Sequence, residues 1–112
     1  MTIQEILQTI HNLKVKYNLD LLFLDFTDVT VLCRLGLSCD IFIQVYTNVK
    51  KDKTNLALVV KGYRIYGIDK ERECIHEHPI TNPESHIPKE TELSIEDFIL
   101  KSIDILNSFG FL

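Results

Sequence analysis

The residue types best suited to chemistry are concentrated in residues 76–88, which read HEHPITNPESHIP. This stretch holds three of the four histidines, His76, His78 and His86, and all three prolines of the chain. Imidazole can both accept and donate a proton near neutral pH, so the three side chains are candidates for general acid–base catalysis. Cleavage of RNA by its own 2′-hydroxyl needs a base and an acid, and these histidines could supply both.

Such a reaction also needs a cation near the charge that develops on the phosphorus centre. Guanidinium binds phosphate oxygens through a two-pronged fork, and Arg64 is the expected cation because its strand directly precedes that of the histidines. We expect the catalytic residues to be His76, His78, His86 and Arg64. The residues expected to bind substrate, by phosphate contact or base stacking, are Arg34, Tyr46 and Tyr66.

Two alternatives remain open for the same stretch. Cys74, His76 and His78 share one face of a strand, but the outer two would lie about 13 Å apart. A metal site would need His86 to fold back onto the pair, so we expect no metal and no other cofactor. The second alternative is structural: the imidazoles would bond backbone carbonyls and make the loop a clasp.

The hydrophobic pattern around this stretch predicts a helix, a sheet and a second helix. Thr2 and Glu5 form a capping box before an apolar stripe that predicts a helix over 3–17. Alternation over roughly 21–78, with short polar turns such as 69–73, predicts antiparallel strands, since parallel pairs need long crossovers. Ser94 is an N-cap for a helix over 94–109. We expect one α+β domain, residues 1–112, with an antiparallel meander of four to six strands whose one face both helices cover.

The composition of the chain indicates which partners and which cellular compartment to expect. The net charge of −4 argues against a protein coated in nucleic-acid-binding charge, although a local basic patch is compatible with it. The three cysteines are widely spaced and form no CxxC motif, which is typical of a reducing compartment. The first residues lack the pattern of a signal peptide, and no apolar run reaches the roughly 20 residues of a membrane span. We expect a cytoplasmic protein with no membrane partner, and a homodimer formed through an open sheet edge.

Several motifs together resemble the TumE-like family of toxins from toxin–antitoxin pairs. They are Arg34-Leu35, DIFIQVY at 40–46, GYRIYGIDK at 62–70, the His-Pro loop and LSIEDFI at 93–99. The histidine loop is the most specific part, and His76, His78, Pro79 and His86 match it. HEH stands where the family commonly has adjacent histidines, and ERECI replaces its aromatic-acidic lead-in.

The resemblance covers roughly residues 30–100 and implies a cytoplasmic toxin with an antitoxin protein as partner. It implies no particular reaction. We therefore expect a toxin-like component of a toxin–antitoxin pair that acts on RNA with a metal-independent, ribonuclease-like activity. The alternative is a noncatalytic binding or dimerisation domain in which the His/Pro loop is a structural clasp.

Overall fold

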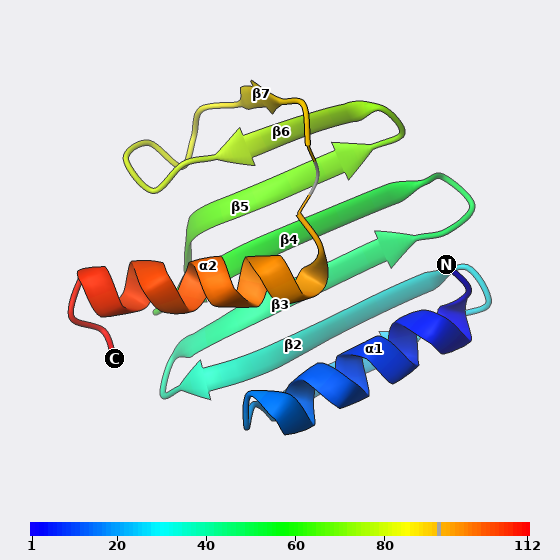
Figure 1. The fold of residues 1–112 in the computed structure, drawn as a ribbon, viewed down its shortest axis with the longest axis horizontal. Coiled ribbons are helices and arrows are strands. Elements are labelled where there is room, and N and C mark those ends of the chain that lie inside the picture. Colours follow the sequence, from blue (N-terminus) through cyan, green and yellow to red (C-terminus); the bar gives the residue numbers. More distant parts are fainter. Residues whose placement is uncertain (92) are drawn as a thin grey trace.

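Two helices pack on a sheet of seven strands in the computed structural model, which describes residues 1–91 and 93–112 (Figure 1). In chain order the elements are α1 (Ile3–Lys16), β1 (Asp20–Phe26), β2 (Thr30–Ser38), β3 (Ile41–Asn48), β4 (Lys53–Val60), β5 (Tyr63–Glu71), β6 (Cys74–His78), β7 (Ile87–Lys89) and α2 (Ile95–Ser108). Each strand pairs antiparallel with the next, so the order in space is the order in sequence. The predicted α+β class is confirmed, although the described residues form seven strands where four to six were expected.

Both helix starts follow from their capping residues. The backbone N–H of Glu5 donates to the Thr2 hydroxyl over 3.1 Å, and the Thr2 N–H donates back to the Glu5 carboxylate over 3.1 Å. At α2 the Asp97 N–H donates to the Ser94 hydroxyl over 3.0 Å. These bonds satisfy N–H groups that have no partner within the helix. The predicted ranges 3–17 and 94–109 therefore match α1 and α2 closely.

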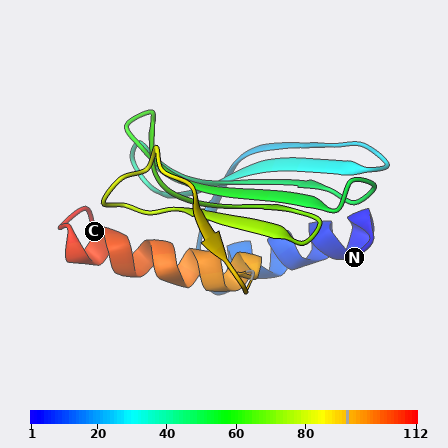
Figure 2. The same cartoon turned by 90° about the horizontal axis from the view of Figure 1, so that it is seen from above.

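Both helices lie against the same side of the sheet, called here the helix face (Figure 2). Along β2 and β3 every second residue is buried there, and Phe98 of α2 and Ile10 of α1 close the core from the other side. The buried apolar residues of β2, β3 and β4 are Val31, Cys33, Leu35, Ile41, Ile43, Val45, Leu56, Leu58 and Val60. The opposite side, called the open face, carries no helix within the described ranges.

Strand β7 is the part of the sheet that the sequence did not predict. It is short, contains Pro88, and pairs with β6 at the edge of the sheet. Proline is tolerated on an edge strand because its missing N–H can face away from the ladder.

Strand β5 is longer than expected: it ends at Glu71, inside the turn predicted at 69–73. Asp69 therefore lies within the sheet and pairs with His76. In the part of the chain that the structure describes, neither helix has the length and apolar character needed to cross a bilayer.

Candidate functional site

The hairpin formed by β6 and β7 brings three histidines together, and we call His76, His78 and His86 the histidine cluster. Glu77 pairs with Ile87 and His76 with Pro88, so the same register places His86 opposite His78. The ring centroids of His78 and His86 lie 4.4 Å apart, and those of His76 and His86 lie 6.0 Å apart. Segments on either side of the proline loop thus converge on the open face.

Two consecutive turns return the chain between the strands. The Asn82 N–H donates to the Pro79 carbonyl over 3.1 Å, and the Ser85 N–H donates to the Asn82 carbonyl over 3.0 Å. The Ser85 hydroxyl donates to the same Asn82 carbonyl over 2.8 Å. Prolines fix the backbone torsion at their positions, so the loop loses little further conformational entropy on folding.

The imidazole of His78 is buried under this loop, with only 1% of the residue exposed. Its Nε2 lies 2.8 Å from Oδ2 of Asp69, on the neighbouring strand β5. Its Nδ1 lies 3.1 Å from the carbonyl oxygen of Pro83 and 3.3 Å from Nη2 of Arg64. His78 therefore ties β5, β6 and the loop together.

Both ring nitrogens of His78 are occupied in either protonation state. A carboxylate can only accept, so Nε2–H donates to Asp69. In the neutral ring Nδ1 accepts from Arg64, whereas in the imidazolium Nδ1–H donates to the Pro83 carbonyl. In this arrangement neither state leaves a nitrogen of His78 free for a substrate.

Arg64 reaches His78 because the residue between them on the open face is Gly67, which pairs with His78. A methyl group at Gly67 would lie 3.4 Å from Cδ of Arg64 and only 3.1 Å from the Leu56 carbonyl oxygen. The absence of a side chain there allows the guanidinium to lie along the sheet. Arg64 itself is exposed, so its other N–H groups can meet a ligand.

His76 and His86 differ from His78 in their surroundings. His86 is exposed and His76 is half-buried. Neither imidazole has a hydrogen-bond partner among the described residues. These two rings are the ones with nitrogens available to a substrate.

Arg34 lies on the same open face, held on three sides. Its Nε donates to Oε1 of Gln44 over 3.0 Å. The guanidinium carbon lies 5.3 Å from the ring centroid of Phe23 and 5.5 Å from that of Phe42, within the range of cation–π attraction. A guanidinium fixed in this way loses little side-chain entropy when it binds an anion.

Strand pairing shows how Arg34 and Tyr46 lie relative to the histidine cluster. Tyr46 pairs with Asn55, Asn55 with Asp69, and Asp69 with His76, which makes one row across the open face. At about 4.8 Å per strand, Tyr46 lies roughly 14 Å from His76 along that row. Arg34 is one strand farther away, in the neighbouring row that ends at His78. An extended ligand crossing the strands could touch both ends.

Tyr66 does not lie with these residues, contrary to its predicted role in substrate binding. It faces the helices, is 3% exposed and stacks on Phe98 with ring centroids 5.5 Å apart. Burial, together with the bond that its hydroxyl donates to Glu77 over 2.8 Å, raises the pKa of Tyr66. The reason is a bulge: Arg64 pairs with Val59 and Tyr66 with Leu58, so the extra residue turns them to opposite faces.

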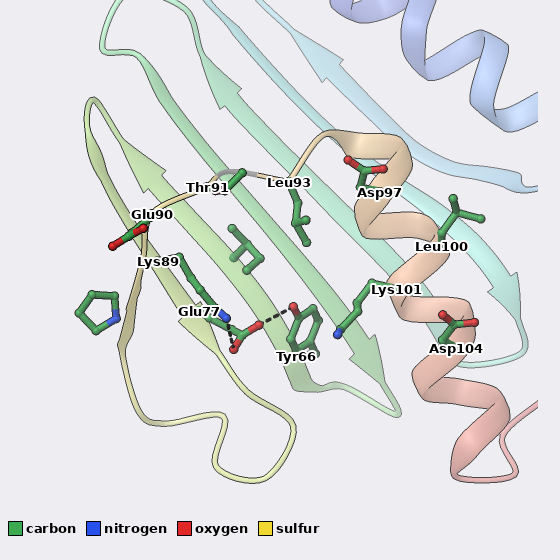
Figure 3. Close-up of a pocket in the computed structure, with 12 residues that line it drawn as sticks. Tyr66, Glu77, Lys89, Glu90, Thr91, Leu93, Asp97, Leu100, Lys101 and Asp104 are labelled. Atoms are coloured by element: carbon green, nitrogen blue, oxygen red, sulfur yellow. Dashed lines mark hydrogen bonds and ion pairs between the residues drawn. The ribbon is translucent and has the colours of Figure 1, made fainter.

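Tyr66 instead lines a cavity of about 760 Å³ between α2 and strands β5 to β7 (Figure 3). Figure 3 shows Lys89 and Tyr66 converging on Glu77, with Lys101 reaching in from α2. The Lys89 ammonium lies 3.5 Å from Oε1 of Glu77. This cavity opens on the helix face, so the sheet separates it from the histidine cluster.

Reasoning from sequence missed Asp69, which orients His78, and the two phenylalanines that hold Arg34. Asp69 could have been found from alternation, because Gly67, Asp69 and Glu71 continue the period of the strand past its predicted end. Phe23 gave no such signal, since its partner across the sheet depends on a register shift in β1. No group of three or more His, Cys, Asp or Glu side chains in residues 1–91 and 93–112 is arranged to hold a metal ion.

Comparison of the chain with protein-family models, with curated proteins and with solved structures finds no match in any of the three. The resemblance to the TumE-like family therefore stays a prediction that rests on the sequence motifs.

Proposed function

We propose that the chain is the toxin-like component of a toxin–antitoxin pair and that it binds and cleaves RNA on its open face. The observation that carries this proposal is the pair of ligand-accessible imidazoles, His76 and His86, whose ring centroids lie 6.0 Å apart. Two imidazoles at this separation can stand on either side of one phosphate group. Arg64 contacts His78, which in turn contacts His86, so a cation belongs to the same cluster.

The reaction follows from these positions. One imidazole of the pair accepts the proton of the 2′-hydroxyl as that oxygen forms a bond to phosphorus. The other donates its proton to the 5′-oxygen as the bond from phosphorus to that oxygen breaks, leaving a 2′,3′-cyclic phosphate. The Arg64 guanidinium stabilises the negative charge that develops on the phosphoryl oxygens.

The rest of the open face would hold the strand on which this phosphate lies. Arg34 offers a fixed guanidinium to a second phosphate, and Tyr46 offers a ring for base stacking. His78 and Asp69 act by positioning, because they fix the loop that carries His86. This assignment moves the proton transfer from all three histidines to two of them.

The cellular setting is part of the same proposal. A toxin that acts on RNA would be cytoplasmic and would be neutralised by an antitoxin protein. The homodimer expected from the sequence stays a prediction about the oligomeric state of the chain. Light scattering of the purified chain at high concentration tests it, since a mass of 13.0 kDa would contradict dimerisation.

A second function is favoured by the burial of His78. Its two ring nitrogens bond Asp69, Pro83 and Arg64, so the imidazole holds the loop against the sheet as a structural clasp would. In that case the chain is a noncatalytic binding domain, and the hairpin of β6 and β7 closes one side of its sheet.

Variants of single histidines separate the two functions. The chain is induced in a bacterial host, and growth is compared with that of His76→Ala, His86→Ala and His11→Ala. His11 is the matched control, because it is an exposed histidine on α1, away from the cluster. The purified proteins are also incubated with single-stranded RNA, and the products are tested for cyclic phosphate ends.

We expect His76→Ala and His86→Ala each to lower cleavage by about 10²–10⁴-fold, the usual contribution of one acid or base, and to relieve growth inhibition. His11→Ala should behave as the wild type. RNA that stays intact with the wild-type protein, or cleavage that both variants retain, would contradict the ribonuclease and leave the clasp as the function of the loop.

A further inference from the structure

Strand β1 leaves its outer side unpaired in the part of the chain that the structure describes. Its whole length is exposed, and its large apolar residues are between 40% and 56% exposed: Leu21, Leu22, Phe23, Leu24 and Phe26. A free edge is a template for another strand, and proteins usually protect it with prolines, charges or short length. The opposite edge has this protection, since β7 is short and carries Pro88 and Lys89.

The apolar residues of β1 lie on both of its faces. Leu24 pairs with Cys33 and Phe26 with Val31, which places both on the helix face. Phe23 pairs with Arg34 and stacks on its guanidinium on the open face. A strand that is apolar on both sides is typical of the interior of a sheet and not of its edge.

A cavity continues this apolar surface beyond the end of β1. It has a volume of about 750 Å³, and its apolar walls are Met1, Ile3, Leu7, Phe26 and Val49. Phe26 is the last residue of β1 and also lines the cavity. A segment that pairs with β1 and continues past Phe26 can therefore place a large side chain in this cavity.

The charges along this edge decide between a second copy of the chain and a different partner. Residues 17–33 include Asp20, Asp25 and Asp28 and no lysine, arginine or histidine. If two copies paired through fully overlapped antiparallel β1 strands, Asp25 of one would face Leu21 of the other. Sliding the strands by one residue would place it opposite Asp20. Neither register gives the carboxylate a cation, and like charges directly opposite each other are destabilising.

We propose that β1 is the docking site for an extended segment of a partner protein, which adds to the sheet as its next strand. The segment has an apolar centre that covers Leu21 to Leu24, and lysine or arginine on both flanks opposite Asp20 and Asp25. Main-chain hydrogen bonds to the free edge supply affinity, and the flanking charges supply specificity. This inference does not depend on RNA cleavage, although the antitoxin of the proposed pair would be such a partner.

Two synthetic peptides test the proposal on the full chain. Both are end-capped and share a centre of four apolar residues, the number that separates Asp20 from Asp25, and one has two lysines at each end where the other has two glutamates. Each is titrated into the isotope-labelled protein while backbone amide resonances are followed. We expect the lysine peptide to bind about tenfold tighter or more. Its shifts should be confined to 19–30 and the cavity residues, with slower hydrogen exchange of the β1 amides.

Substitutions on the protein give a sharper test. Leu24→Lys should lose binding of the lysine peptide, whereas Val15→Lys should retain it. Val15 is the matched control, as an apolar residue of α1 that is 65% exposed and lies off the edge. The double variant Asp20→Lys/Asp25→Lys should reverse the preference and bind the glutamate peptide. Unchanged thermal midpoints would show that each variant is folded.

Three outcomes would overturn the proposal. The first is binding of both peptides with equal affinity, and the second is binding that leaves the β1 resonances unchanged. The third is sedimentation of the wild type at twice its mass with a loss of that mass in Leu24→Lys, which would assign the edge to a second copy. None of these outcomes depends on growth inhibition or RNA cleavage, so the proposed function is tested separately.

Discussion

The imidazole of His78 lies between an aspartate, an arginine and a backbone carbonyl, whereas that of His86 has solvent on its outer side. The two rings touch, yet we propose different roles for them because their burial and hydrogen bonding differ. A ring with both nitrogens bonded fixes geometry, and a ring with free nitrogens can exchange protons. The proposed site therefore depends on His78 for its shape and on His76 and His86 for its chemistry.

This division of roles predicts how substitutions affect stability. His78→Ala leaves Asp69, Arg64 and the Pro83 carbonyl without their shared partner and opens a cavity, so we expect it to lower the free energy of unfolding by about 2–4 kcal/mol. His86→Ala, at an exposed ring, should change it by less than about 0.5 kcal/mol. Urea denaturation of both variants measures the difference. Equal stability of the two would show that His78 is no clasp.

At the scale of elements, the central strands carry most of the core. Ile43 of β3 is fully buried between the paired strands β2 and β4, and it faces the helices. Its neighbour Gln44 points to the open face, where its side chain is half-buried. Because burial alternates in this way, side chains on the helix face contribute more to the free energy of unfolding than those on the open face.

Ile43→Ala should therefore lower the free energy of unfolding by about 2–5 kcal/mol, through lost transfer energy and the cavity left behind. Gln44→Ala is the control on the same strand and should cost less, because the side chain is partly solvated. Thermal or urea unfolding followed by circular dichroism measures both. A smaller effect of Ile43→Ala than of Gln44→Ala would show that the faces are assigned wrongly.

The helices and the antiparallel meander could be predicted because their signals are local. Thr2, Glu5 and Ser94 cap helices through bonds that span three residues, and alternation marks each strand without reference to its neighbours. The strand β7 could not be predicted, because its three residues acquire their conformation from pairing with β6. A short segment with proline has no local preference for a strand.

The candidate site was predictable in part for the same reason. The histidines were visible as a cluster in sequence, and Arg64 was predictable because consecutive strands form a hairpin. Tyr66 was expected to bind substrate, but it lies on the helix face, away from Arg64. The two residues share one phase of the alternation until the bulge between them breaks it. A bulge depends on how two strands fit together, which the pattern of one strand does not contain.

The free energy of unfolding of the whole molecule should fall at alkaline pH, because a buried thiol in its core loses its proton. Burial raises the pKa of the Cys33 thiol from 9.0 to about 11. The unfolded chain then loses this proton at lower pH than the folded one. The contribution is fully present below about pH 9 and is lost as pH rises from about 9 to about 11, with a limit of about 2–3 kcal/mol.

Cys33→Val removes this titration with a side chain of similar size. We expect the variant to lose less stability than the wild type between about pH 9 and pH 11 in urea denaturation. Cys39→Val, at an exposed thiol, is the matched control. If the loss in Cys33→Val equals that in the wild type, the alkaline transition has another origin, such as the phenol of Tyr66.

The order of the strands has a consequence for how the molecule forms. Because every strand pairs with its neighbour in sequence, each ladder closes a loop of only a few residues, and sheets built from such local contacts tend to fold quickly. The contacts between α2 and the sheet join residues farther apart in sequence, because α2 follows all the strands and its Phe98 packs on Tyr66 of β5. During synthesis, successive hairpins can therefore assemble while the apolar side of β4 and β5 is still bare. We therefore expect the nascent chain to be most prone to aggregation when its sheet is complete and α2 has not yet packed on it.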